Sequence, residues 1–294
     1  MDNLYKKVVV VAAVNGGMQQ SRDGAIVPTQ PQEIAEAARL CREAGAAVVH
    51  FHGRDTEGRN TTDPQVYAET IRRIRERSDI LVQTTNGIGV RRNPQTGELT
   101  WPSDEERFKL LNLQPEQDLF GIAAGSMDFY NPGGGYTDET PYVNSEHLLR
   151  GIMPAVLGRG AALEIEVTEA SVFHRLDRLA SQGVFDRNSR NFWFLHGGGF
   201  GATPPEPRAI LFSIDAGQRM FPHARWGIVG TGRDQGWIAS FGLAIGCDTV
   251  RVGFEDSLYR ANGQVARHNH QLVEDVVKMA RLLGREILGV TRGR

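Results

Sequence analysis

The chain has 294 residues, of which 40% are hydrophobic and 23% are charged, and its formal net charge at pH 7 is −2. This balance gives no reason to expect a nucleic acid or an anionic membrane surface as a partner. No apolar run approaches the roughly 20 residues that a transmembrane helix needs, so we expect a globular protein large enough for one α/β barrel or two smaller domains.

Eight segments are predicted to be strands, and most of them have the apolar, β-branched character of strands buried on both faces. These segments are residues 8–14, 46–52, 80–84, 119–123, 161–167, 191–195, 226–229 and 249–252. A helical segment is predicted after each strand, from apolar periodicity and helix-start signals. The predicted helices are residues 31–44, 63–74, 103–111, 144–157, 171–180, 207–219, 235–244 and 267–283.

Strands that alternate with helices predict a parallel sheet, and eight such units in a chain of this length predict a (β/α)8 TIM barrel. We therefore expect one α/β domain that spans residues 1–294. The competing layout, an open doubly wound sheet, would favour a Gly-x-Gly-x-x-Gly turn after the first strand. The chain has Asn15-Gly16-Gly17-Met18 there instead.

The cysteines, Cys41 and Cys247, do not form the pattern of a disulfide framework. Free buried thiols favour a reducing compartment, so we expect a cytoplasmic protein. Residues 8–14 follow two lysines as a short signal sequence would, but no small-x-small cleavage site comes before the chain turns polar. We interpret this run as the first strand.

Two histidines, His50 and His52, stand at the carboxyl end of the second predicted strand. Side chains at i and i+2 of a strand point to the same face, so the two rings are expected to project together. A catalytic zinc can be held by two His and one Glu with one position left open. The spacing therefore suggests half of a metal site, and the alternative is a pair of structural histidines.

The third ligand is predicted to be Glu255, which follows the eighth strand. In a closed barrel the eighth strand neighbours the first, and the first neighbours the second, so this carboxylate can reach the two histidines. Asp256 would then lie beside the metal and could act as a base. Arg251, on the last strand, either points into the barrel to bind a carboxylate or pairs with a glutamate of the fifth strand.

Every predicted strand ends in polar or glycine-rich residues, and barrel active sites form at this end. Two local patterns are rejected as sites, and a third is a weak motif. The run His196-Gly197-Gly198-Gly199 resembles a lipase oxyanion loop, but the chain has no Gly-x-Ser-x-Gly elbow. His268 and His270 fall on a predicted helix, where residues i and i+2 diverge, and are expected to be exposed. The run 230–233 is a weak dinucleotide motif, although barrels often bind phosphate after the seventh strand.

Taken together, these segments resemble the β-keto acid cleavage enzymes, from Val8 through the final helix. The resemblance is carried by His50-Phe51-His52, Thr84-Thr85-Asn86-Gly87, Gly125-Ser126-Met127-Asp128-Phe129, Glu164-Ile165-Glu166-Val167, Gly230-Thr231-Gly232-Arg233, Arg251-Val252-Gly253-Phe254-Glu255-Asp256 and Asn269-x-Gln271-Leu272-Val273. It implies a (β/α)8 barrel with a divalent metal on His50, His52 and Glu255. The metal expected most is Zn²⁺, and Co²⁺, Mn²⁺ and Fe²⁺ are the other possibilities.

The resemblance also implies a reaction: condensation of a β-keto acid with acetyl-CoA, which gives acetoacetate and a new acyl-CoA. The metal would act as a Lewis acid and Asp256 would take the C2 proton. Arg251 and Glu166 match the polar support around this base. The substrate-binding residues expected from the resemblance are Met18, Thr84, Thr85, Asn86, Gly87 and Ser126, with Arg233 at CoA.

The chain departs from the family pattern at several positions. Met18 stands where the relative acting on an amino-substituted keto acid has a glutamate, and a thioether cannot pair with an ammonium. We therefore expect 3-keto-5-aminohexanoate to be a poor substrate and a neutral or apolar chain to be preferred. Asn86, Asp128 and Thr249 replace a usual glycine, asparagine and histidine.

Three other functions remain as alternatives from the sequence. A metal-dependent aldolase or hydrolase would use the same barrel with metal-bound water in place of acetyl-CoA. A non-haem iron oxygenase could also use two His and one carboxylate. A non-catalytic acyl-CoA or metabolite-binding protein would be expected to have lost Asp256. We also expect a homo-oligomer, either a dimer or a tetramer.

Overall fold

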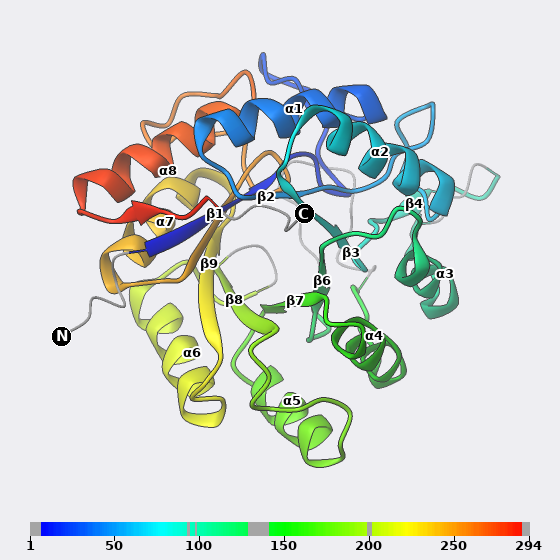
Figure 1. The fold of residues 1–294 in the computed structure, drawn as a ribbon, viewed down its shortest axis with the longest axis vertical. Coiled ribbons are helices and arrows are strands. Elements are labelled where there is room, and N and C mark those ends of the chain that lie inside the picture. The colour runs from blue at the N-terminus through cyan, green and yellow to red at the C-terminus, as the bar shows by residue number, and fades with distance from the viewer. Residues whose placement is uncertain (1–6, 93–94, 98, 129–140, 199–201, 290–294) are drawn as a thin grey trace.

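The computed structural model describes residues 7–92, 95–97, 99–128, 141–198 and 202–289. Eight parallel strands form a closed ring, and Figure 1 looks down this ring with the helices around its outside. The strands are β1 (Lys7–Ala13), β2 (Val48–His50), β3 (Leu81–Thr85), β6 (Leu119–Ala123), β7 (Ala162–Val167), β8 (Phe192–Gly198), β9 (Arg225–Gly230) and β10 (Thr249–Val252). The pairing of β10 with β1 closes the ring, so the predicted (β/α)8 barrel is confirmed.

Helices follow these strands in the predicted order. They are α1 (Pro31–Ala44), α2 (Pro64–Arg77), α3 (Asp104–Phe108), α4 (Glu146–Gly158), α5 (Val172–Ser181), α6 (Pro207–Met220), α7 (Gln235–Ile245) and α8 (His270–Leu282). Two short 3-10 turns, η1 (Lys109–Asn112) and η2 (Gly232–Asp234), precede β6 and α7. In the part of the chain that the structure describes, none of these helices has the length and apolarity needed to cross a bilayer.

Local sequence explains where the first helices begin and end. The carboxylate of Glu33 accepts from the backbone N–H groups of Thr29 and Gln30, and Pro31 occupies the first turn of α1. Gly45 ends α1 with φ of 116°, a left-handed conformation that favours glycine. Asp63 caps α2 by accepting from the backbone N–H of Gln65 at 2.9 Å.

Several element boundaries differ from the sequence predictions. β2 ends at His50, so His52 lies beyond the strand, and α8 begins at His270 rather than at residue 267. The third helix is a short α-helix that continues as the 3-10 turn η1. Three short strands were not predicted from the sequence. Two of them, β4 (Arg91–Arg92) and β5 (Leu99–Thr100), pair with each other, and the third, β11 (Glu286–Ile287), extends the sheet beside β1.

The barrel interior is apolar in one half and polar in the other. Its amino-terminal half holds a small cluster that includes Val11, Val48 and Leu119, whereas the larger core lies between the strands and the helices. Two residues further along β2 and β3, the inward-facing side chains are His50 and Gln83. On β10 the inward-facing side chain is Arg251. This change places buried polar groups at the carboxyl ends of the strands, where barrel active sites form.

Candidate metal centre and active site

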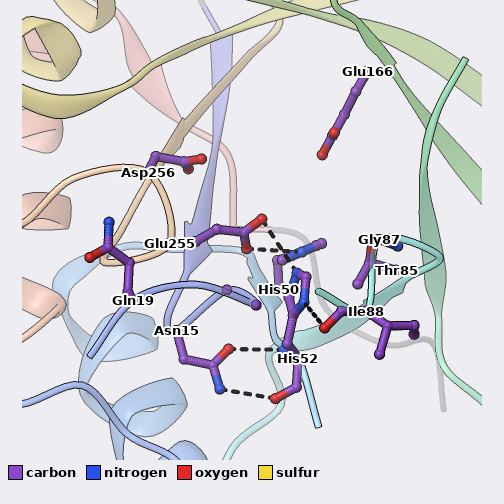
Figure 2. Close-up of polar contacts among 12 residues, drawn as sticks. Asn15, Gln19, His50, His52, Thr85, Gly87, Ile88, Glu166, Glu255 and Asp256 are labelled. Carbon is purple, nitrogen blue, oxygen red and sulfur yellow. Dashed lines mark hydrogen bonds and ion pairs between the residues drawn. The ribbon is translucent and has the colours of Figure 1, made fainter. Parts of the chain in front are cut away.

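The two histidines and Glu255 meet beyond the end of β1. His50 is the last residue of β2, His52 lies just past it, and Glu255 lies in the turn that follows β10. The Nε2 atom of His50 lies 3.1 Å from Oε2 of Glu255, and Nε2 of His52 lies 3.4 Å from Oε1. Figure 2 shows dashed contacts that run from this carboxylate to both rings. The three possible ligand atoms all lie within 4.8 Å of one another.

The donor atoms of this cluster fit a divalent cation. Nε2 of both histidines and Oε2 of Glu255 are buried, and apart from their contacts with one another they have no hydrogen-bond partner, an arrangement that a cation bound between them would satisfy. The opposite ring nitrogens are engaged: Nδ1 of His50 lies 2.8 Å from Oε1 of Gln83, and Nδ1 of His52 lies 3.3 Å from the carbonyl oxygen of Ile88. Since both acceptors favour a proton on Nδ1, the Nε2 lone pairs face the cluster, as metal ligation requires.

Arg251 connects the cluster to three further carboxylates inside the barrel. Its guanidinium lies 2.5 Å from Glu255, 2.7 Å from Glu166 and 3.7 Å from Glu164. It also forms a two-point pair with Asp256, at 2.9 Å from Nε and 3.1 Å from Nη2. Arg251 thus points into the barrel and pairs there with the glutamates of β7, which is the second of the two alternatives left open by the sequence.

Burial and charge shift the pKa values of the acidic groups in opposite directions. Burial raises the pKa of Asp256 to about 6, and the Glu255 carboxylate adds to this while Arg251 opposes it. Burial also raises the pKa of Glu164 to about 7, again against the effect of Arg251. Burial acts in the same sense on Glu255, but the charge of Arg251, joined by those of His50 and His52 whenever these rings are protonated, outweighs it and holds the pKa well below its ordinary value. Glu255 is therefore the carboxylate that stays ionised, as a ligand must.

Two glycines allow the chain to approach this closely. Gly253 has φ of +149°, and a Cβ there would lie 2.0 Å from the carbonyl oxygen of Ala13. A Cβ on Gly16, where φ is +64°, would lie 2.5 Å from Cγ of Glu255. A larger residue at either position would displace the backbone or the Glu255 side chain.

The expected substrate-binding residues lie around the barrel mouth at different depths. Thr85 is in register with Gly121 on the interior side of β3, and its hydroxyl accepts from the backbone N–H of Gly87 at 2.9 Å. Thr84 is in register with Phe120, which belongs to the helix-facing core, so it lies on the other face of the strand. Asn86 is fully buried, and neither polar atom of its side chain has a hydrogen-bond partner.

The remaining expected residues are more exposed. Ser126 is exposed and lines a cavity of 440 Å³ together with Met127, Thr168 and Glu169. Met18 is half-buried in the turn after β1. The exposed Arg233 lies over the ring of Tyr259, 4.1 Å from its centroid. These three residues line the rim rather than the metal cluster.

The sequence analysis missed several groups that complete the site. Gln83 carries a polar side chain in an otherwise strand-like run, and this was the available signal for its contact with His50. Tyr142 is 6% exposed, and its hydroxyl oxygen would lie 3.1 Å from a Cβ placed on Gly87, so it overhangs the mouth. Burial raises the pKa of Tyr142 to about 12, so the phenol stays protonated at neutral pH.

Three other histidines were singled out in the sequence: the pair His268 and His270, and His196. The prediction that His268 and His270 diverge and are exposed was wrong: their rings stack at 5.7 Å with 12° between planes, and both are half-buried. His268 precedes α8, so helical geometry does not apply to the pair. His196 is 2% exposed, and its Nδ1 lies 2.8 Å from the Ser213 hydroxyl on α6, which makes it a core residue.

Comparison with known proteins shows to which family and fold the chain is similar. The chain is 31% identical to the 3-keto-5-aminohexanoate cleavage enzyme of Fusobacterium nucleatum over 97% of this chain and 95% of that protein. It is 25% identical to the 3-oxoadipate:acetyl-CoA acetyltransferase of Cupriavidus necator over 97% and 93% of the two chains. Among solved structures, the complex of ObcA with oxaloacetate has a similar fold, with a TM-score of 0.73 at 19% identity over 89% of this chain. The chain spans only 65% of the length of ObcA. A family model described as "beta-keto acid cleavage enzyme" matches residues 7–294, and the chain belongs to this family.

Proposed function

We propose that this protein condenses a β-keto acid with acetyl-CoA and releases acetoacetate and an acyl-CoA. Family membership and the names of its relatives, among them an acetyl-CoA acetyltransferase, support this reaction. The observation that carries the proposal is the position of Asp256, a carboxylate adjacent to Glu255 and held at two points by Arg251. A buried carboxylate held in this way beside a candidate metal site is suited to act as a general base.

The metal ligands in this proposal are His50, His52 and Glu255, which form the one candidate metal cluster found among the described residues. Two imidazoles and one carboxylate suit Zn²⁺, and Co²⁺, Mn²⁺ or Fe²⁺ would also be accepted by these donors. A bound cation would supply a Lewis acid for the keto and carboxylate oxygens of the substrate.

The protein side chains then have distinct roles. Asp256 removes a proton from C2 of the β-keto acid, while Arg251, which is itself paired with Glu166, holds Asp256 in place. C2 forms a bond to the acetyl carbonyl carbon, and the CoA thiolate leaves. The thiolate adds to the original keto carbon, the C2–C3 bond breaks, and C2 regains a proton as acetoacetate departs. The original acyl group leaves as the new thioester.

Substrate contacts are proposed for the residues around the mouth: Met18, Thr84, Thr85, Asn86, Gly87 and Ser126 for the keto acid, and Arg233 for CoA. The unpartnered amide of Asn86 supports a polar ligand nearby. Thr84 is the exception among them: it lies on the helix-facing side of β3, so it would act by positioning the end of the strand rather than by direct contact with the substrate.

We also propose that the substrate carries a neutral or apolar chain. Met18 lies in the turn that begins beside Glu255 and offers no charge to an ammonium group. Replacing it in Met18→Glu should raise kcat/KM for 3-keto-5-aminohexanoate roughly tenfold or more, whereas Met18→Leu should not. A wild-type preference for the amino substrate over a neutral β-keto acid of equal length would overturn this part of the proposal.

The assembly and compartment are part of the proposal as well. We expect a homo-oligomer, a dimer or a tetramer, and the exposed Leu211 and Phe212 of α6 offer an apolar surface for it. The buried free thiols of Cys41 and Cys247 are typical of a protein from the reducing cytoplasm.

The decisive experiment combines metal analysis with a panel of β-keto acids and acetyl-CoA, with acetoacetate and acyl-CoA as the products measured. Wild-type protein should form both products in equal amounts, and Asp256→Asn should lose most of the rate while retaining bound metal. Hydrolysis or retro-aldol products formed without CoA turnover would instead indicate a hydrolase or an aldolase.

A further inference from the structure

The segment that carries His52 extends past the end of its strand. β1 and β2 pair as far as Ala13 and His50, and one more backbone bond follows, from the N–H of Val14 to the carbonyl oxygen of His50 at 3.0 Å. Beyond this point a side chain continues the pairing. The Oδ1 atom of Asn15 accepts from the N–H of His52 at 2.9 Å, and its Nδ2 donates to the His52 carbonyl oxygen at 2.9 Å. Figure 2 shows both bonds.

The segment that carries Glu255 is held to the same end of β1 in a similar way. β10 ends at Val252, and Glu255 donates its own N–H to the carbonyl oxygen of Ala13 at 3.1 Å. Asn269 accepts from the N–H of Phe254 at 2.9 Å through Oδ1, and its Nδ2 donates to the carbonyl oxygen of Val14 at 2.9 Å. A second amide therefore joins the end of β1 to the residue before the ligand.

Both amides are buried, with Asn15 fully enclosed and Asn269 3% exposed. We propose that Asn15 and Asn269 are positioning residues of the metal centre: Asn15 sets the position of His52 and Asn269 sets that of Glu255. Each amide replaces a peptide group at a point where the sheet has ended, and offers both a donor and an acceptor. The inference rests on the proposed metal site.

Asparagine suits these positions because its side chain reproduces both polar atoms of a peptide unit. Aspartate has the same shape but lacks the donor, so it would leave the carbonyl oxygen of His52 or of Val14 facing a carboxylate oxygen. Alanine would leave the buried N–H of His52 or of Phe254 without its partner. In either case the ligand segment loses the contact that fixes it, while the strands of the barrel keep their own hydrogen bonds.

The test uses metal-free full-length chain titrated with Co²⁺, followed by calorimetry and by visible absorption. Asn15→Ala and Asn269→Ala should bind Co²⁺ roughly 10- to 100-fold more weakly than wild type, the usual effect of removing a group that orients metal ligands. Their Co²⁺ spectra should also change. The matched control is Gln117→Ala, because Gln117 is a 3% exposed amide that donates to the carbonyl oxygen of Leu110, before β6 and away from the site.

Stability of the metal-free variants is measured alongside by urea unfolding. Gln117→Ala should lose stability and still bind Co²⁺ like wild type, whereas the two asparagine variants should lose affinity beyond any loss of stability. If either alanine variant fails to fold, Asn15→Asp or Asn269→Asp keeps the shape and should show the same weakened binding. Wild-type affinity and spectrum in the folded asparagine variants would overturn the inference. Absence of Co²⁺ binding by wild type would be a different failure, that of the proposed metal site.

Discussion

Arg251 should be among the most important single residues for stability, because it lies within 4 Å of four carboxylates in the barrel interior while only 3% of its side chain is exposed. Arg251→Met keeps much of the length of the side chain and removes every donor. Removing one partner of a buried ion pair typically costs about 3–5 kcal/mol, because the remaining charge is left uncompensated. We expect a loss of that size in the free energy of unfolding of the metal-free protein.

The same contacts predict strong coupling between Arg251 and Asp256, its two-point partner. Asp256→Asn removes one of the carboxylates that Arg251→Met leaves unpaired. The double variant should therefore be more stable than the sum of the single losses implies, by about 1–3 kcal/mol, within the range seen for residues in direct contact.

Urea unfolding with a chelator present measures these free energies. The control is Arg39→Met: Arg39 also pairs with two carboxylates, those of Glu36 and Glu43, but on the exposed face of α1 with 33% of its side chain exposed. Such surface pairs contribute less than about 1 kcal/mol. If Arg251→Met cost no more than Arg39→Met, or if the Arg251 and Asp256 losses were additive within about 0.5 kcal/mol, the reasoning from burial would be refuted.

Three further predictions follow from the described geometry. Because burial holds the pKa of His196 at about 3 and its ordinary value is 6.5, the unfolded chain binds the extra proton first as pH falls. This residue should therefore lower the free energy of unfolding by about 2 kcal/mol between roughly pH 7.5 and pH 5. It is packed against the Ser213 hydroxyl and the rings of Phe173 and Trp226. In His196→Gln, the free energy of unfolding measured in urea should change less over this pH range. Gly253→Ala should lower the midpoint of thermal unfolding and weaken metal binding, since its Cβ would meet the Ala13 carbonyl oxygen at 2.0 Å; unchanged values for both would show that the turn can relax. Addition of metal at about 100 times its dissociation constant should stabilise the chelator-treated protein by about 2.7 kcal/mol, and His50→Ala should abolish this gain in calorimetric melting.

Much of the fold was determined by local sequence. The apolar run predicted at 8–14 forms β1 (Lys7–Ala13) because β-branched side chains suit a strand buried on both faces. Helix α1 begins and ends at residues whose side chains and conformations are suited to those positions. The alternation of these two signals over eight units is what identified the barrel. Two of the boundaries that differ from the prediction are the end of β2, before His52, and the start of α8, after residues 267–269. At both places, side-chain hydrogen bonds with residues distant in the sequence are present where the regular backbone hydrogen bonds end.

The sequence by itself determined which chemistry the mouth of the barrel could offer: two imidazoles in the second unit, and a glutamate followed by an aspartate in the eighth. Strand order alone was enough to bring them to the two strands on either side of β1. Only the tertiary structure decided how they are held, because the partners are far apart in the chain. Gln83 contacts His50, Asn15 contacts the backbone of His52, and Asn269, the residue before the last helix, contacts the backbone next to Glu255. A side chain's own sequence neighbours cannot reveal such partners, since the contact exists only once the barrel has closed.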